Sequence, residues 1–185
     1  SPTPRCSPGP PHAAGNAAPA ILAAIPPAGT VVAVNVSAAT GERKTSSPEV
    51  LLVAEHGIEG DAHAGAWHRQ ISLLAQESID KMKAAGLDVG PGAFAENITT
   101  LGVEVAALPV HTTVEVGEAL LEITQIGKEC HSRCAIYEQA GDCVMPREGV
   151  FARVLRGGKV TPGDEVRVKA WGTGPRGVSA QRAGE

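Results

Sequence analysis

The chain has 185 residues, a formal net charge of −4, and 43% hydrophobic but only 3% aromatic residues. This length suits one domain with a core of Val, Leu, Ile and Ala. The acidic balance gives no general attraction for nucleic acid or for an anionic membrane surface, and no apolar run approaches the roughly 20 residues of a membrane-spanning helix, so we expect neither partner.

Both ends of the chain have the composition of linkers. Residues 1–29 are rich in Pro, Ala, Gly and Ser and lack acidic residues, which leaves too little apolar surface to order them. We interpret 1–29 and 171–185 as disordered tails or linkers around a domain at 30–170, which would suit a module of a longer fusion protein. We expect a cytoplasmic protein, with an organelle as the alternative if the first segment is the remnant of a transit peptide.

The middle of the chain predicts short strands separated by Gly and Pro. Residues 76–85 form the clearest predicted helix, because Ile79 and Met82 share a face and Gly86 follows as a cap. This pattern favours a β-barrel or β-sandwich with little helix. The predicted strands are 31–36, 50–54, 70–75, 97–100, 112–116, 120–126, 150–155 and 165–168.

The first candidate site is the glycine-rich segment 57–65, which contains Asp61 and His63, together with His68-Arg69-Gln70 after it. Glycine lets a backbone approach a ligand closely, and the planar fork of arginine suits phosphate. The histidines would donate to phosphate oxygens or bind a metal. The alternative is that they are solvated loop residues.

A second candidate is Asn97, which stands at the start of a predicted strand in Phe94-Ala95-Glu96-Asn97. Asparagine in such a place commonly caps a turn through its own backbone. The functional alternative is that its amide reads the donor and acceptor edge of a heterocycle.

Cysteines at 130, 134 and 143 form the third candidate. Their spacing lacks the second close pair of a structural zinc site. Lys128 and Arg133 bring positive charge that favours a thiolate, which suits a soft-metal ligand or a sulfur carrier. The alternative is that these cysteines are buried small hydrophobic residues. Arg147 follows, either completing an anion site or pairing with Glu148 on the surface.

Five segments in order resemble the motifs of the MOSC family, the C-terminal domain of molybdenum cofactor sulfurases. They are Gly-Ile-Glu-Gly-Asp-Ala-His at 57–63, His-Arg-Gln-Ile-Ser-Leu-Leu at 68–74, Phe-Ala-Glu-Asn-Ile at 94–98, the segment 117–131 ending in Gly-Lys-Glu-Cys-His, and the stretch from Cys143 through Pro-Gly-Asp at 162–164. The resemblance covers about 30–170 and is closest to short bacterial-type members.

The resemblance implies a MOSC-type, pyruvate-kinase-like β-barrel with one or a few short helices, and binding of the molybdenum–pterin cofactor. Cys134 precedes Ala-Ile and so matches the family's cysteine before a short apolar run better than Cys130 does. Cys134 is therefore the predicted molybdenum ligand and working thiol, with Cys130 second. The predicted cofactor-binding residues are Asp61, His63, His68, Arg69, Gln70, Asn97, Lys128 and Arg147.

In function, the resemblance implies maturation of the molybdenum cofactor, sulfur transfer or delivery, with cofactor-biosynthesis proteins or molybdoenzymes as partners. We expect the chain not to extract sulfur from cysteine itself, since no segment would house the pyridoxal-phosphate-dependent desulfurase domain of full sulfurases. Two alternatives are a molybdenum-dependent reductase of N-hydroxylated compounds and a non-catalytic interaction module of a larger protein.

Overall fold

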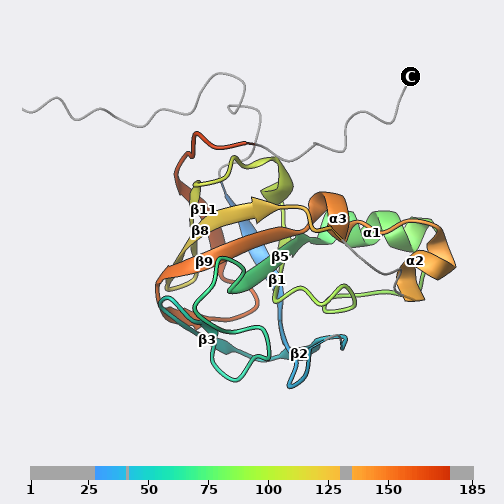
Figure 1. The fold of residues 1–185 in the computed structure, drawn as a ribbon, viewed down its shortest axis with the longest axis horizontal. Helices are drawn as coiled ribbons and strands as arrows, with labels where there is room; N and C mark the ends of the chain where they lie inside the picture. Colours follow the sequence, from blue (N-terminus) through green and yellow to red (C-terminus); the bar gives the residue numbers. More distant parts are fainter. Residues whose placement is uncertain (1–27, 41, 130–134, 176–185) are drawn as a thin grey trace, which may run out of the picture.

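A barrel dominates the computed structural model, which describes residues 28–40, 42–129 and 135–175. Seven of its strands follow the order β11-β7-β8-β9-β5-β6-β1, and pairing of β11 with β1 closes the ring (Figure 1). Closure removes the exposed strand edges that an open sheet would leave. The predicted β-barrel is thus confirmed. Its strands are β1 (Ala28–Val36), β5 (Ile71–Ala75), β6 (Ile98–Leu101), β7 (Thr113–Val116), β8 (Ala119–Ile126), β9 (Val150–Arg156) and β11 (Glu165–Ala170).

Short strands extend this barrel. β2 (Thr45–Ser47) pairs with the end of β1, while β3 (Val50–Val53) lies between β4 (Gly57–Ile58) and β10 (Gly158–Val160) in a small second sheet. The glycine-rich composition of 57–65 indicates a loop, but its first two residues form β4, because Ile58 pairs with Leu52 and both side chains are buried.

Few helices accompany the strands, as predicted. α1 (Gln76–Ala84) ends one residue before the predicted limit, and Gly86 follows it with a positive φ of 95°. The other helices in the described residues are α2 (Ala135–Ala140), α3 (Met145–Glu148) and the 3₁₀ helix η2 (Val105–Ala107). In the part of the chain that the structure describes, no helix has the length and apolar character to cross a membrane.

Two hydrophobic clusters lie on opposite sides of the barrel wall, one inside the barrel and one between the wall and the helices. Val, Ile, Leu and Ala fill the interior, including Leu73 of β5. The next residue, Leu74, faces outward and packs with Ile79, Met82 and Phe94, so strand β5 is buried on both faces. This second cluster holds the helices against one side of the barrel, where Figure 1 shows α1, α2 and α3 together. The candidate site lies beside it.

Candidate functional site

The segment that leads from β4 into β5 carries five of the predicted site residues. Gly57 and Gly60 adopt positive φ angles of 122° and 81°, which glycine reaches at little cost. A Cβ on Gly57 would lie 2.7 Å from the carbonyl oxygen of Gln70. The backbone at the two ends of this segment therefore touches, and the residues between form a compact loop.

Asp61 is held in this loop by a buried ion pair that residue types alone do not reveal. Lys44 Nζ lies 2.6 Å from Asp61 Oδ1, and both side chains are only 1% exposed. The backbone N–H groups of Ser37 and His63 also donate to the two carboxylate oxygens, at 3.0 and 3.1 Å. Lys44 was not predicted as a site residue, and no local signal marks it, since its partner lies 17 residues away.

These contacts keep Asp61 ionised. Burial would raise its pKa, but the hydrogen bonds from Lys44 and the Ser37 backbone, together with the charge of Lys44, lower the pKa below its ordinary value. Removing one partner of such a pair leaves an uncompensated buried charge. Asp61 therefore stays ionised near neutral pH, and its buried ion pair with Lys44 anchors the loop.

His63 contacts the Lys44–Asp61 pair through its imidazole ring. Its Nδ1 lies 3.2 Å from Lys44 Nζ, and its side chain is partly exposed. Burial and the charges of Lys44 and Lys128 lower the pKa of His63, against the opposite effect of Asp61. The imidazole is therefore neutral at pH 7 and offers one donor and one acceptor.

A pocket brings His63 together with Arg69, from later in the same segment, and with residues of other segments. Lys128 lies just after β8, and Asn97 lies just before β6. No carboxylate lines this pocket within the described residues, and neither Arg69 nor Lys128 forms an ion pair there. We call it the cationic pocket. Its full lining is His63, Trp67, Arg69, Ser72, Phe94, Ala95, Asn97, Lys128, Met145 and Phe151.

Arg69 is held in its orientation by contacts with two uncharged side chains, Phe151 and Gln125. Its guanidinium carbon lies 5.2 Å from the centre of the Phe151 ring, a cation–π geometry. Its Nε donates to Gln125 Oε1 at 3.0 Å, and Gln125 Nε2 donates to the Gly127 carbonyl at 2.8 Å. Gln125 was not predicted as a site residue. Its place in an otherwise ordinary strand gives no signal, because its partner is 56 residues away.

The side-chain amide of Asn97 makes three hydrogen bonds to other groups of the protein. Its Oδ1 accepts from the Ser72 backbone N–H at 3.1 Å and from Ser72 Oγ at 3.0 Å, and its Nδ2 donates to the Asn35 carbonyl at 3.2 Å. The amide thus ties β5 to β1. One N–H of the amide is left for a ligand, so direct recognition of a heterocycle by Asn97 stays a prediction.

Glu96, beside Asn97, stabilises the pocket wall from within. Its carboxylate accepts hydrogen bonds from the backbone of Gly92 and Phe94 and from Thr99 Oγ1. The residue is fully buried, and burial raises its pKa despite these bonds. The bonds fix the turn in which Ala95 takes a positive φ of 63°.

His68 and Gln70 line a different pocket, which shares Trp67 with the cationic pocket. His68 Nε2 lies 3.1 Å from Gln125 Oε1, on the exposed side of that residue. Gln70 is buried and accepts from the Val154 backbone N–H at 2.9 Å, which joins β5 to β9. The structure does not bring these two side chains to the cationic pocket, so their cofactor-binding roles stay predictions.

The remaining predicted residues divide into two groups. Arg147 forms a two-pronged pair with Asp142, at 2.7 and 2.6 Å, on the surface of α3, and is not part of the cationic pocket lining. Cys130 and Cys134 lie outside the described residues, between Lys128 and the start of α2. Cys143 is buried and packs in the second hydrophobic cluster. The described residues contain no cluster of His, Cys, Asp and Glu that could hold a metal ion.

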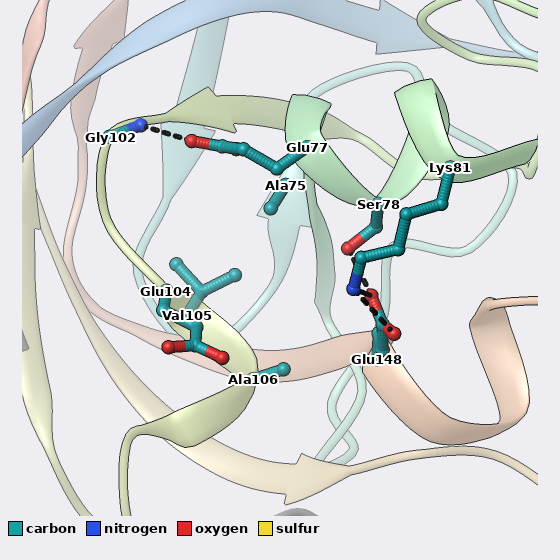
Figure 2. Close-up of a pocket in the computed structure, with 9 residues that line it drawn as sticks. All are labelled: Ala75, Glu77, Ser78, Lys81, Gly102, Glu104, Val105, Ala106 and Glu148. Atoms are coloured by element: carbon teal, nitrogen blue, oxygen red, sulfur yellow. Dashed lines mark hydrogen bonds and ion pairs between the residues drawn. The ribbon is translucent and has the colours of Figure 1, made fainter. Parts of the chain in front are cut away.

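A third pocket, lined by carboxylates, lies between α1, η2 and α3. Figure 2 shows its carboxylates, Glu77, Glu104 and Glu148, and we call it the carboxylate pocket. Glu148 accepts from Ser78 and, at 3.0 Å, from Lys81, while Glu77 accepts from the Gly102 backbone N–H at 2.8 Å (Figure 2). Its charged groups are thus largely matched within the protein.

Comparison with solved structures shows the same fold in bacterial proteins. The YuaD protein from Bacillus subtilis superposes with a TM-score of 0.66 at 16% identity, over 78% of this chain and 97% of that one. YiiM from Geobacillus stearothermophilus gives 0.59 at 20% identity over 80% and 79%, and YiiM from Escherichia coli gives 0.56 at 20% over 82% and 74%. No curated protein sequence gives a significant match.

A family model covers more than half of the chain. Residues 60–167 match the model of the MOSC domain. This range includes the cationic pocket from His63 to Phe151 and the barrel strands from β5 onward. The chain belongs to the MOSC domain family.

Proposed function

We propose that the chain binds the molybdenum–pterin cofactor in the cationic pocket and acts in its maturation, sulfur transfer or delivery. The observation that carries the proposal is the unmatched positive charge of this pocket: Arg69 and Lys128 line it beside His63, without an acidic residue among the described lining. MOSC domains are associated with this cofactor. Cofactor-biosynthesis proteins or molybdoenzymes are the corresponding partners.

The donor set of the pocket fits such a group. The fork of Arg69 and the point charge of Lys128 suit phosphate oxygens. Phe94, Phe151 and Trp67 supply flat apolar surface on which a pterin ring can stack. An anionic group joined to a flat heterocycle therefore finds both of its partners here.

The residues would divide the task by chemistry. His63, Arg69 and Lys128 would hold the anionic end, and Asp61 would act through His63 as a buried support. Asn97 has one N–H left for the heterocycle. Cys134, with Cys130 as the second candidate, would ligate the metal or carry sulfur; both lie in the stretch that follows Lys128 in the sequence. When bound, the cofactor would supply a metal centre that accepts sulfur.

Reconstitution with the released cofactor under reducing conditions tests the proposal. Molybdenum and pterin retained after gel filtration are measured for wild type, Arg69→Gln and Lys128→Gln. Each substitution removes a charged contact, so we expect about tenfold or greater loss of affinity. Arg167→Gln is the matched control, because it removes one positive charge from an exposed pair on β11. Equal retention by all four proteins would contradict the pocket assignment.

The cysteine assignment is tested in the same assay. We expect Cys134→Ala to lose molybdenum while keeping pterin bound through the cationic pocket. Loss in Cys130→Ala alone would transfer the role to that residue, and full retention in both would remove the cysteine from the proposal. Arg147→Gln is measured in the same assay, because the predicted cofactor-binding role of Arg147 rests on its position in the sequence and Arg147 does not line the cationic pocket.

A further inference from the structure

Lys44 makes three contacts from a position that is shut off from solvent. Its Nζ lies 2.6 Å from Asp61 Oδ1, 3.2 Å from His63 Nδ1 and 3.4 Å from Ser37 Oγ. An ammonium group has three donors and no acceptor. Each of these contacts therefore uses one N–H of Lys44, and each partner must act as an acceptor.

This requirement decides where the imidazole of His63 carries its proton. Nδ1 can accept from Lys44 only if it is unprotonated, so the proton of the neutral ring must be on Nε2. If Nδ1 carried the proton, two hydrogen-bond donors, the ring N–H and the Lys44 ammonium, would face each other with their nitrogens 3.2 Å apart. Burial, together with the charges of Lys44 and Lys128, also lowers the pKa of His63, which supports a neutral ring.

The backbone of His63 is fixed on both sides. Its N–H donates to Asp61 Oδ2 at 3.1 Å, and its carbonyl accepts from Trp67 Nε1 at 3.0 Å. The ring edge with Nδ1 faces Lys44, and His63 lines the cationic pocket, so Nε2 is the ring nitrogen left for a ligand. There it would add a neutral donor to those of Arg69 and Lys128.

We propose that Lys44 is a positioning residue: it holds His63 as the Nε2–H tautomer, so that the ring acts as a hydrogen-bond donor toward an anionic ligand in the cationic pocket. The ligand part rests on the proposed function, whereas the tautomer is a property of the ligand-free protein. If the Lys44–Asp61 pair only stabilised the loop, the tautomer of His63 would not depend on Lys44.

Nitrogen-15 NMR of the histidine rings in the ligand-free protein tests the tautomer. The signals of His63 are assigned by their loss in His63→Gln. In wild type we expect an unprotonated Nδ1 and a protonated Nε2. In Lys44→Met the donor to Nδ1 is gone while Asp61 Oδ2 lies 3.7 Å from Nδ1, so we expect Nδ1 to take up a proton. A wild-type ring protonated on Nδ1, or an unchanged Nε2–H ring in Lys44→Met, would overturn the proposal.

Asp61→Asn is the matched control, because it keeps Lys44 and the shape of the carboxylate. The ring should stay in the Nε2–H form there; a switch would assign the tautomer to Asp61 and overturn the role of Lys44. If Lys44→Met does not fold, Lys44→Met with Asp61→Asn removes both buried charges. The ring should then populate both tautomers, and a pure Nε2–H ring would count against the proposal.

Binding of inorganic phosphate, followed by calorimetry, tests the consequence. Lys44→Met should weaken phosphate binding about tenfold, the effect of one lost donor to a charged ligand. In a His63→Gln background the same change should have little effect, because the amide of glutamine donates without a tautomer. Equal weakening in both backgrounds would overturn the positioning role. If wild type binds no phosphate, the proposed function loses support, while the ring measurement still decides the tautomer.

Discussion

The cationic pocket and the carboxylate pocket lie on the same domain, but their charges are matched differently. In the carboxylate pocket, Lys81 and Ser78 bond to Glu148, and Glu77 bonds to the Gly102 backbone (Figure 2). In the cationic pocket, Arg69 and Lys128 have no acidic partner among the described residues. Charge that the protein itself compensates stabilises packing, whereas charge left unmatched in a concave site is available to a ligand.

The largest effect should follow loss of the lysine beneath the cationic pocket. Lys44→Met leaves Asp61 buried without its cation, and we expect the free energy of unfolding to fall by about 3–5 kcal/mol. Lys81→Met, in the carboxylate pocket, removes a lysine that is 49% exposed, and the buried Glu148 keeps its hydrogen bond from Ser78, so we expect a smaller loss of about 1 kcal/mol. Urea unfolding followed by circular dichroism measures both. Equal losses would show that the two pockets do not differ in this respect.

Glu96→Gln should have an intermediate effect on the wall of the cationic pocket. One carboxylate oxygen that accepts a backbone N–H becomes an NH₂ group, so we expect a loss of about 1–3 kcal/mol. Thr124→Val is the control for loss of a less buried side-chain contact with the backbone, because Thr124 Oγ1 donates to the carbonyls of His68 and Phe151. A loss no larger than that of the control would remove the supporting role of Glu96.

Glu96→Gln should also change how the free energy of unfolding depends on pH. Burial raises the pKa of Glu96 above its ordinary value of 4.5, so the folded protein binds this proton more tightly than the unfolded chain does. The stabilising contribution is then present below pH 4.5 and is lost as the pH rises through the raised value. In Glu96→Gln this fall should be absent. An identical profile for the two proteins would contradict the raised pKa.

A smaller effect should follow loss of the glutamine that orients Arg69. Gln125→Ala leaves the cation in place but removes its acceptor, so we expect phosphate binding to weaken roughly 2- to 10-fold, the value of one hydrogen bond. Gln76→Ala is the control, since the Gln76 side chain bonds to the exposed Asp80 on α1. Unchanged binding in Gln125→Ala would show that Phe151 alone orients the guanidinium.

The smallest effect should come from Glu77→Gln in the carboxylate pocket. Its contact with the Gly102 backbone is exposed, so we expect the free energy of unfolding to change by about 1 kcal/mol or less. Phosphate binding should not change, because the residue does not line the cationic pocket. A clear gain in phosphate binding would mean that the field of the carboxylate pocket reaches the ligand site.

The barrel strands could be predicted where apolar residues recur between turn residues. Residues 31–36 lie in β1 and 120–126 in β8, and in β8 the buried Leu121 and Ile123 alternate with less buried residues. β2, β4 and β10 have two or three residues each, too few for a period to appear. α2 and α3 were missed for the same reason, since they have six and four residues.

The candidate site was predictable where a residue type is conspicuous in its local sequence. His63, Arg69, Asn97 and Lys128 were all singled out, and all four line one pocket. Lys44 and Gln125 were not, because their importance depends on partners that only folding brings near. Gln70 shows the reverse: a polar residue beside a functional motif that bonds to the Val154 backbone instead of lining the pocket.

Closure of the barrel has a consequence for protein engineering. Ala28 of β1 pairs with Arg167 of β11, so the first and last strands of the domain are neighbours. A short linker can therefore join them, and the chain can be opened at the turn between β7 and β8, where Gly117 and Glu118 connect paired strands. Such a circular permutant keeps every strand pair of the barrel and the segments that carry Lys44 and Arg69. We therefore expect the cationic pocket to form in the permuted chain as well.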